Sequence, residues 1–365
     1  MTAGFFAPLP PARTGVADYA AALLGEMRKL GRVEIGAAEA DTRLYHLGNN
    51  QLHRATYEQA LERPGVVVLH DAVLHHFLLG GLTERAYIDE FVYNYGEWNR
   101  GLGQTLWRDR ARSAADPRYF EYPMLRRAVE SARVVVVHNP AAARIVRAHA
   151  EAARVVEIPH LFVQPEAVDR ADVEKLRRGM GMDAGDFLFG VFGHLRESKR
   201  LASVVAAFER VRREMPRAGL LIAGDFVSTD LARSLEPSVK AAGVRRIGFL
   251  KEPDFWRYAA AVDACVNLRY PAAGESSGIA IRLMGIGKPV MVTEGEETSR
   301  IPEGACVRVD TGDAEIDMLT EYMRWMAISP GAAREIGARA AAHIAEHHAI
   351  DRVAAQFWRV LEESR

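Results

Sequence analysis

The most constraining feature of the sequence is a repeated alternation of short Val-rich runs with amphipathic segments. The runs GVVVLHD (65–71), SARVVVVHNP (131–140) and ARVVEIPH (153–160) show no alternation of apolar and polar residues. Strands of a parallel sheet that is covered on both faces have this character. Segments with helical spacing, such as VADYAAALLGEMRKLG (16–31), separate the runs, so the pattern predicts an α/β fold built from strand–helix units.

The alternation occurs twice along the chain. It begins at TAGFFAPL (2–9) and restarts at DFLFGVFGHL (186–195), after a polar stretch with Pro and Gly at 162–186. A chain of 365 residues is also long enough for two domains. We therefore predict two doubly wound domains, 1–164 and 165–347, which face each other across a cleft.

Two further segments depart from the strand–helix rhythm. Residues 72–130 are rich in aromatic residues and arginine, and we predict an inserted helical subdomain there. The region 313–365 has helical spacing, and we expect its last helix, near 348–365, to pack back on the first domain.

The bulk composition narrows the range of partners and compartments. The formal net charge of −1 gives no reason to expect a nucleic-acid partner. No apolar segment reaches the roughly 18 residues of a membrane span, and MTAGFFAPLPPARTG lacks the basic and long apolar regions of a signal peptide. We expect a cytoplasmic protein in which Cys265 and Cys306 are buried thiols rather than a disulfide or a nucleophile.

Ligands of doubly wound domains bind beyond the carboxyl ends of the strands, so residues at these ends are site candidates. After the first strand, Thr14 and Gly15 open a helix, where a glycine lets a phosphate approach backbone amides. An ordinary turn capped by Thr14 is the alternative. His70 follows the 65–71 run, and it either binds substrate hydroxyls or is a buried histidine paired with a backbone carbonyl.

Further histidines follow the same strands. His75 and His76 complete an HDxxxHH cluster, but its spacing matches no zinc signature, and we predict no metal site. His138 and His160 also stand at strand ends, and we expect a structural role for His138.

A basic cluster follows the first strand of the second half. In FGHLRESKR (192–200) the strand ends at Gly193, and Lys199 is expected in the first turn of the next helix. Cations are disfavoured at a helix N-terminus, so Arg196, Lys199 and Arg200 together favour a phosphate site over solvated surface charge.

The stretch GESSGIAIRLMGIGKPV (274–290) predicts a second anion site. A serine caps a helix there, and Gly278 allows close backbone approach. Glu275 is placed to accept hydrogen bonds from sugar hydroxyls, and Arg282 lies two turns further on the same face. A simple Glu275–Arg282 ion pair is the alternative.

Together these motifs resemble those of retaining glycosyltransferases with the GT-B fold, two facing Rossmann-like domains, in the group 1 or GT4 class. The resemblance spans nearly the whole chain and rests on PLPPARTGVADYAAALL, VVVLHD, VFGHLRESKRLASVVAAF, LLIAGDF and GESSGIAIRLMGIGKPV. It implies hexosyl transfer (EC 2.4) from a nucleoside diphosphate sugar to a carbohydrate, lipid-linked or small-molecule acceptor. It also implies that neither a cofactor nor a metal is needed.

Carried over residue by residue, the resemblance implies four catalytic side chains. Lys199 would neutralise the diphosphate, His70 would contact the transferred sugar, and Glu275 would hold its hydroxyls. Arg196 would supply the charge of a family arginine that is His194 here. The donor-binding residues would be Gly15, Gly193, His194, Gly224, Phe249, Leu250, Ser277, Gly278, Ile279 and Arg282.

One departure from the family pattern leaves the nucleotide preference open. The family's second glutamate often binds the ribose. Counted back from Gly287, its place is taken by Arg282, whereas eight residues after Glu275 stands Leu283.

Three alternatives differ from a transferase. A nicotinamide-dependent dehydrogenase needs a G-x-G-x-x-G fingerprint, which neither half contains. A nucleotide-sugar epimerase or phosphorylase shares the fold, and a non-catalytic sugar-nucleotide-binding subunit would explain His194 and Arg282. The four arginines and two tryptophans of segment 98–112 suit contact with anionic lipid or a lipid-linked acceptor at the inner membrane face, but we favour the alternative of a solvated lid helix. The oligomeric state stays open.

Overall fold

The computed structural model describes residues 1–365, which form two compact units. Unit 1 comprises Met1–Leu161, Pro271–Ser276 and His347–Arg365, and unit 2 comprises Phe162–Tyr270 and Ser277–Glu346. The segment Pro271–Ser276, expected in the second domain, belongs to unit 1. The backbone explains this difference, because Ala72 N donates a 2.7 Å hydrogen bond to Ala273 O.

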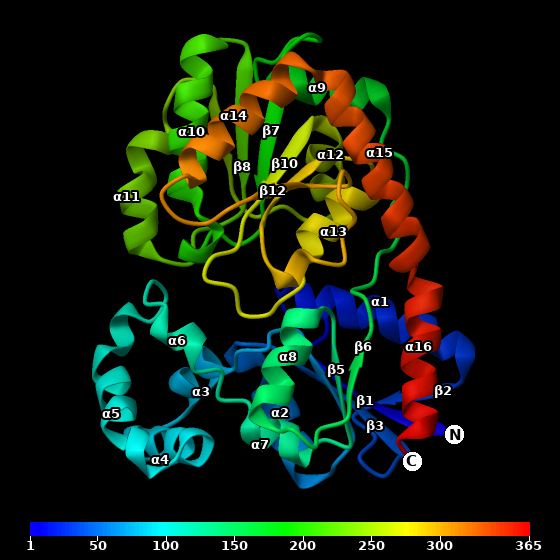
Figure 1. The fold of residues 1–365 in the computed structure, drawn as a ribbon. Helices are drawn as coiled ribbons and strands as arrows, with labels where there is room; N and C mark the ends of the chain where they lie inside the picture. Colours follow the sequence, from blue (N-terminus) through cyan, green and yellow to red (C-terminus); the bar gives the residue numbers. More distant parts are fainter. The chain divides into compact units, whose positions relative to one another are not determined.

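Unit 1 is built on a six-stranded sheet in the order β2-β1-β3-β4-β5-β6, with every neighbouring pair parallel (Figure 1). The parallel sheet predicted from the Val-rich runs is thereby confirmed. The strands are β1 (Thr2–Phe6), β2 (Arg32–Ile35), β3 (Thr42–Leu47), β4 (Val66–Leu69), β5 (Val134–Val137) and β6 (Val155–Glu157). The helices outside the insertion are α1 (Gly15–Leu30), η1 (Gln51–His53), α2 (Arg54–Glu62), α8 (Pro140–His149) and α16 (Ile350–Glu363).

Strand β4 shows why the Val-rich runs lack alternation. Val66 and Val68 belong to one apolar core, while Val67 and Leu69 belong to the core on the opposite face. The first of these cores also contains buried residues of α1 and α16, which pack on each other. The C-terminal helix therefore lies within unit 1.

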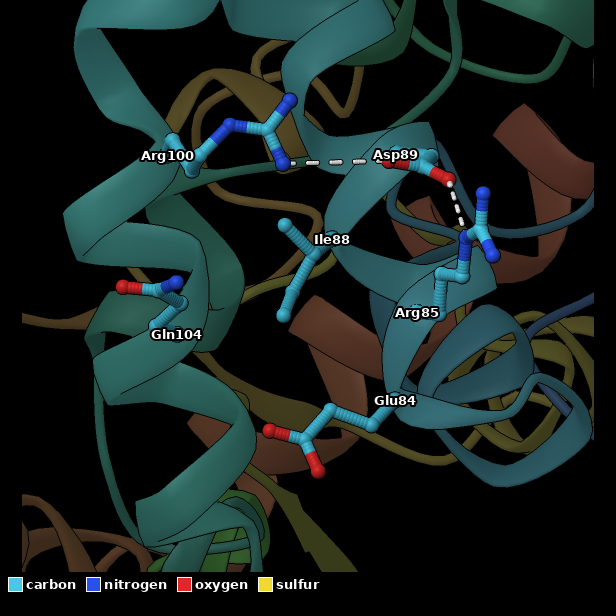
Figure 2. A pocket seen from close by; sticks show the side chains of 6 residues that line it. All are labelled: Glu84, Arg85, Ile88, Asp89, Arg100 and Gln104. Atoms are coloured by element: carbon cyan, nitrogen blue, oxygen red, sulfur yellow. Dashed lines mark ion pairs between the residues drawn. The ribbon is translucent and has the colours of Figure 1, made fainter.

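The insertion predicted for 72–130 is helical. It contains α3 (His75–Gly81), α4 (Glu84–Tyr95), η2 (Glu97–Asn99), α5 (Arg100–Asp109), η3 (Arg110–Arg112), α6 (Arg118–Glu121) and α7 (Arg126–Ser131). Asp89 on α4 lies 3.9 Å from Arg85 and 3.8 Å from Arg100 of α5, beside a surface pocket of about 320 Å³ (Figure 2).

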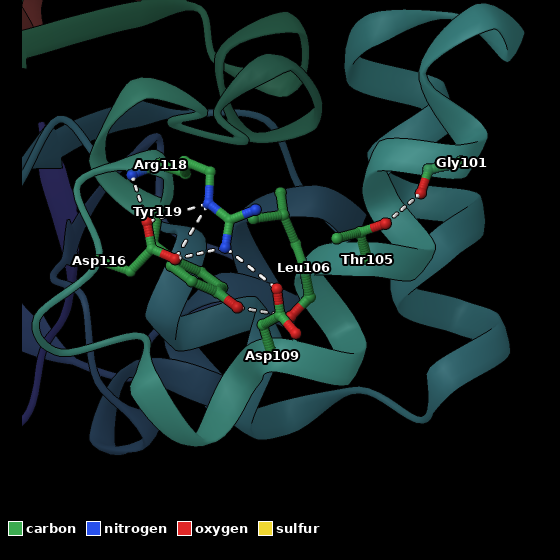
Figure 3. Close-up of polar contacts among 7 residues, drawn as sticks. All are labelled: Gly101, Thr105, Leu106, Asp109, Asp116, Arg118 and Tyr119. Carbon is green, nitrogen blue, oxygen red and sulfur yellow. Dashed lines mark hydrogen bonds and ion pairs between the residues drawn. The ribbon is translucent and has the colours of Figure 1, made fainter.

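Polar contacts hold the far end of the insertion together (Figure 3). Arg118 pairs with Asp116 at 2.6 Å and with Asp109 at 3.1 Å. The buried Tyr119 hydroxyl donates a 2.5 Å hydrogen bond to Leu106 O. These contacts tie the loop after α5 to α6, so the insertion has an ordered framework of its own.

Unit 2 is built on a second six-stranded parallel sheet, in the order β12-β11-β10-β7-β8-β9. Its strands are β7 (Phe187–Phe192), β8 (Ala218–Ala223), β9 (Val244–Ile247), β10 (Ala264–Asn267), β11 (Val290–Thr293) and β12 (Val307–Val309). Its helices are α9 (Arg170–Gly179), η4 (Glu197–Lys199), α10 (Leu201–Glu214), α11 (Thr229–Val239), α12 (Glu252–Ala261), α13 (Gly278–Gly285), η5 (Glu296–Thr298), α14 (Glu315–Ile328) and α15 (Pro330–His347).

Two elements of unit 2 differ from the sequence expectations. The polar stretch 162–186 contains helix α9, none of whose residues is fully buried, so its composition resembled a linker. The helix that was expected to contain Lys199 in its first turn begins instead at Leu201, after the separate turn η4.

Each sheet has one switch point, which is the place where the strand order reverses direction. In unit 2 the chain runs from β7 to β8 and β9, then returns to place β10 on the other side of β7. In unit 1 the corresponding point lies between β1 and β3. Ligands of doubly wound sheets bind beyond the strands at such points.

Candidate functional site

Two glycines lie at the carboxyl ends of β7 and β8, next to the switch point of unit 2. Gly193 follows β7 with φ +84°, and Gly224 follows β8 with φ +141°. A Cβ on Gly224 would lie 2.0 Å from Gly193 O, so any larger residue would displace one of the two strand ends. Both predicted glycines therefore have a backbone reason to be glycine, independent of any ligand.

Lys199 is buried at the same strand end. Its Nζ donates a hydrogen bond to Phe192 O, and a Cβ on Gly193 would lie 3.3 Å from that Nζ. Lys199 belongs to η4 and not to the first turn of α10, because Arg200 between them adopts a left-handed conformation with φ 55°. The ammonium group thus lies at the carboxyl end of β7, next to Gly193.

The basic cluster predicted around Lys199 is smaller than expected. Arg200 pairs at 2.8 Å with the buried carboxylate of Glu315, which removes it from the anion site. Arg196 and His194 remain exposed beside Lys199. Partial desolvation, followed by the charges of Arg196 and Lys199, lowers the pKa of His194.

The N-terminus of α13 meets the same strand end. Ser277 Oγ caps the helix by accepting from Ala280 N at 3.3 Å. The same Oγ accepts 2.6 Å and 3.4 Å hydrogen bonds from the side chains of Asn267 and Arg269, which end and follow β10. A Cβ on Gly193 would lie 3.5 Å from Ile279. The structure therefore brings Gly193, Lys199, Ser277, Gly278 and Ile279 together.

Arg282 turns toward helix α12. Its guanidinium carbon lies 3.9 Å from the Phe255 ring centre and 4.3 Å from that of Trp256. Arg282 also forms an ion pair with Glu252, the first residue of α12. Three contacts thus join α13 to the first turns of α12, and the predicted nucleotide contact of Arg282 stays a prediction.

The loop between β9 and α12 carries Phe249 and Leu250. Phe249 N donates a 3.2 Å hydrogen bond to Asp225 Oδ1, in the loop that follows Gly224. The Phe249 side chain is 49% exposed. An exposed aromatic ring near the ends of β7 and β8 can stack on a planar ligand group.

Glu275 belongs to unit 1. Its Oε2 accepts a 2.6 Å hydrogen bond from Ala273 N. Asn139, which follows β5, donates to Gly274 O at 3.0 Å and to Ser276 Oγ at 3.1 Å. The segment that carries Glu275 is therefore anchored to residues that follow β4 and β5.

His70 lies at the end of β4 in the same unit. It is buried, and its Nε2 lies 3.0 Å from His46 Nδ1. Burial, followed by the neighbouring histidines, holds the pKa of His70 well below its usual range. His138 donates instead to the backbone, with Nδ1 at 2.9 Å from Ile158 O, in agreement with the structural role expected for it.

Gly15 is the first residue of α1, which Thr14 caps by accepting from Val16 N at 3.4 Å. A Cβ added to Gly15 would meet nothing within 4 Å. Packing within unit 1 therefore gives no reason for glycine at this position.

The HDxxxHH cluster does not converge. The ring nitrogens of His75 contact Tyr122 O and the Tyr87 hydroxyl, each at 2.7 Å. Those of His76 contact Asn49 at 3.3 Å and Ser113 O at 3.1 Å. No group of three or more His, Cys, Asp or Glu side chains is arranged to hold a metal ion.

Both cysteines are buried and unbridged, which confirms the prediction of buried thiols. Burial raises the pKa of Cys265 to about 12 and also raises that of Cys306. Neither thiol therefore has the depressed pKa of a nucleophile.

The insertion carries exposed groups but no predicted catalytic residue. The Trp98 side chain is fully exposed, and Arg110 lies over the Trp107 ring at 4.4 Å. The pocket of Figure 2 is lined by Glu84, Arg85, Ile88, Asp89, Arg100 and Gln104. None of the helices combines the length and the apolar character that a membrane span requires.

Several residues at these sites were not anticipated from the sequence. They are His46, Asn139, Asn267 and Arg269. The sequence did contain a signal for His46. It is the penultimate residue of β3, and the other histidines of this group also lie near the carboxyl ends of strands. The hydrogen bonds of Asn139 join segments that are distant in the sequence, so no local pattern could reveal them.

Comparison with known structures identifies the fold of the chain. No protein-family model matches the sequence, and no curated protein is significantly similar to it. Anabaena HepE, solved in complex with UDP and glucose, is 15% identical, with 100% of each chain covered and a TM-score of 0.73. Sucrose-phosphate synthase from Thermosynechococcus elongatus is 15% identical over 99% of this chain and 98% of its own, with a TM-score of 0.66.

A third structure agrees with these two. WaaG, a glycosyltransferase involved in lipopolysaccharide biosynthesis, is 14% identical over 99% of each chain, with a TM-score of 0.65. The chain therefore has the GT-B fold that was expected from its motifs.

Proposed function

We propose that the chain is a glycosyltransferase that takes a sugar from a nucleoside diphosphate sugar. The observation that carries the proposal is the convergence of Gly193, Lys199 and the N-terminus of α13 at the switch point of a GT-B fold. HepE, which matches over its full length, binds UDP and UDP-glucose in its crystal structures. A uridine diphosphate sugar is accordingly the first donor to test.

In this proposal the donor diphosphate binds at unit 2. Gly278 and Ile279 are the first two residues of α13. The free N–H groups at this helix N-terminus and the helix dipole both favour an anion. The Lys199 ammonium supplies a buried positive charge, and Arg196 adds an exposed one. These groups stabilise the departing diphosphate, which is where charge develops during transfer.

The nucleotide would lie against the loop after β9. Phe249 and Leu250 offer an apolar surface to the base. Gly224, His194 and Gly15 border the phosphates, and Arg282 supports the loop through its contacts with the start of α12.

The sugar would be held by groups of unit 1. Glu275 accepts hydrogen bonds from hydroxyls, and His70 contacts the transferred unit. The reaction would proceed with retention, and the departing phosphate would accept the proton of the acceptor hydroxyl. We expect activity without added metal or cofactor.

The acceptor is proposed to bind to unit 1 and its helical insertion. A carbohydrate acceptor suits the fold. A lipid-linked acceptor at a membrane surface is also compatible with the exposed Trp98 and with the arginines of α5 and η3. A non-catalytic sugar-nucleotide-binding subunit is the second candidate, because Arg282 and His194 stand where relatives of the group 1 class place other residues. An epimerase or phosphorylase is the third.

The test is incubation of the purified chain with UDP-, GDP-, ADP-, CDP- and dTDP-sugars, with and without EDTA, followed by product analysis. Release of nucleoside diphosphate with sugar transfer or hydrolysis supports the proposal. Epimerised donor or a sugar phosphate product indicates the third candidate. Saturable binding without any turnover indicates the second, and no binding of any nucleotide contradicts all three.

A further inference from the structure

Histidines mark the carboxyl ends of four adjacent strands in unit 1. His46 lies in β3, His70 and His138 follow β4 and β5, and His160 comes after β6. Tyr19 of α1 contacts all four rings, with centroid distances of 4.8 to 5.9 Å. His70 occupies the middle of this cluster, in ring contact with both His46 and His138.

The His70 ring has one hydrogen-bond partner within the protein. Its Nε2 lies 3.0 Å from His46 Nδ1. Its Nδ1 makes no hydrogen bond within the protein. Unlike the buried Nε2 atoms of His46 and His138, this Nδ1 is not closed off from solvent. Nδ1 is therefore the atom that His70 offers to a ligand.

Which nitrogen of His70 carries the proton depends on His46. Both rings are neutral near pH 7, because burial lowers the pKa of His46 to about 3 and that of His70 also falls well below its usual range. His46 Nε2 is buried without any partner. If the proton of His46 were on Nε2, a buried N–H would be left without an acceptor, which is rarer in proteins than an unused acceptor.

Two neighbours show the same pattern. The Nδ1 atoms of His53 and His138 face the backbone carbonyls of His46 and Ile158 at 2.9 Å, so each carries its proton on Nδ1. Each leaves a buried Nε2 without a partner. By the same logic His46 carries its proton on Nδ1 and donates it to His70 Nε2.

We infer that His46 is a positioning residue that fixes His70 as the Nδ1–H tautomer, so that His70 offers its ligand an N–H donor. The inference rests on the proposed function only for the nature of that ligand, a sugar or phosphate oxygen. A His70 whose lone pair is already engaged by His46 stabilises an oxygen and does not act as a general base.

The direct test reads the wild-type chain and needs no substrate. Long-range ¹H–¹⁵N spectra of the chain with ¹⁵N-labelled histidine, at pH 7.5, report which ring nitrogen of each histidine is protonated. A His70→Gln spectrum assigns the His70 signals. We expect His70 as Nδ1–H. An Nε2–H tautomer at His70 overturns the inference.

Variants of His46 test the cause. His46→Leu removes the donor, and we expect the His70 signals to shift toward the Nε2–H tautomer or a mixture. His46→Asn retains an N–H near the position of Nδ1 and should restore the wild-type signature. His138→Asn, a change in the same cluster that leaves the His46–His70 pair intact, is the matched control. An unchanged His70 tautomer in folded His46→Leu contradicts the inference.

Activity separates this inference from the proposed function. If the chain turns over UDP-glucose, His46→Leu should lower kcat by about tenfold or more with little change in donor KM, and His46→Asn should recover most of it. Loss in KM alone would contradict the positioning role. Absence of turnover in the wild type would count against the proposed function, and the spectra would still decide the tautomer.

Discussion

The amide of Ala72 donates a 2.7 Å hydrogen bond to the carbonyl of Ala273. This contact joins the residues that follow His70 to the segment that carries Glu275. Asn139 adds a second attachment through Gly274 O and Ser276 Oγ. His70 and Glu275, which are proposed to handle the sugar, therefore belong to unit 1, while Lys199, Gly278 and Ile279, which are proposed to bind the diphosphate, belong to unit 2.

Lys199 is expected to contribute donor affinity beyond its structural role. Lys199→Met keeps the aliphatic stem and removes the charge, and we expect UDP affinity to fall by roughly tenfold or more, since hydrogen bonds to charged groups contribute about 1.5–3 kcal/mol. Isothermal titration with UDP measures the change.

Lys288 provides the matched control for this variant. It is another lysine of unit 2 that donates to backbone carbonyls, at 2.8 Å to Ala260 O and 2.7 Å to Val262 O. Lys288→Met should lower stability without a comparable loss of UDP affinity. Equal losses in the two variants would show that Lys199 acts only through the fold.

Gly15 and Gly224 are expected to respond differently to alanine. In Gly15→Ala the new Cβ meets nothing within 4 Å, so the free energy of unfolding should hardly change. If the helix end receives a phosphate, affinity for UDP-glucose should nevertheless fall. Gly224→Ala would place its Cβ 2.0 Å from Gly193 O at φ +141°, and should cost about 2–3 kcal/mol or more of stability. Urea denaturation and titration of both variants make the comparison. Unchanged donor affinity in Gly15→Ala would remove Gly15 from the site.

Arg282 is expected to support the contact between α13 and α12. Arg282→Ala removes two ring contacts and an ion pair with the exposed Glu252, and should lower stability by about 1 kcal/mol. Arg282→Lys keeps the charge but loses the planar stack, so it should recover only part of this. Denaturation curves test the order of the variants. A fall in UDP affinity in Arg282→Ala that exceeds the loss in Lys199→Met would instead indicate a direct nucleotide contact.

Stability should decline in mild acid because of the buried histidines. Burial lowers the pKa of His46 to about 3 and that of His138 to about 4. The unfolded chain binds protons near pH 6.5, so their contribution is complete above that pH and is lost as the pH falls toward 4, by roughly 1.4 kcal/mol per pH unit for each histidine. Denaturation at pH 7.5, 6 and 5 measures this slope. His138→Asn should reduce it by about one proton, and an unchanged slope would contradict the assignment.

Much of the fold could be predicted from the sequence because its determinants are local. Val-rich runs buried on both faces predicted the parallel strands, and helical spacing over 16–31 predicted α1 near its observed bounds. The bounds of the two units could not be predicted for Pro271–Ser276, because its attachment to unit 1 depends on Ala72 and Asn139, which are distant in sequence. Arg200 was misplaced for a similar reason, since its partner Glu315 lies on a remote helix.

The candidate site divides in the same way. Glycines and charges at strand ends pointed to Gly193, Lys199 and Glu275, because the carboxyl edge of a parallel sheet is visible in the order of its strands. The His46–His70 pair was not visible, since it depends on β3 and β4 becoming neighbours. The hydrogen bond from Asn267 to Ser277 was not visible either, since it depends on the path of the chain between β10 and α13.

Donor binding tests the central claim most directly. Isothermal titration of the purified chain with UDP-glucose, GDP-glucose and ADP-glucose, repeated for Lys199→Met and Lys288→Met, measures whether a nucleotide sugar binds and where. The account predicts saturable binding of at least one donor, retained in Lys288→Met and weakened roughly tenfold or more in Lys199→Met. Absence of binding to every nucleotide sugar by the folded wild-type chain would contradict it.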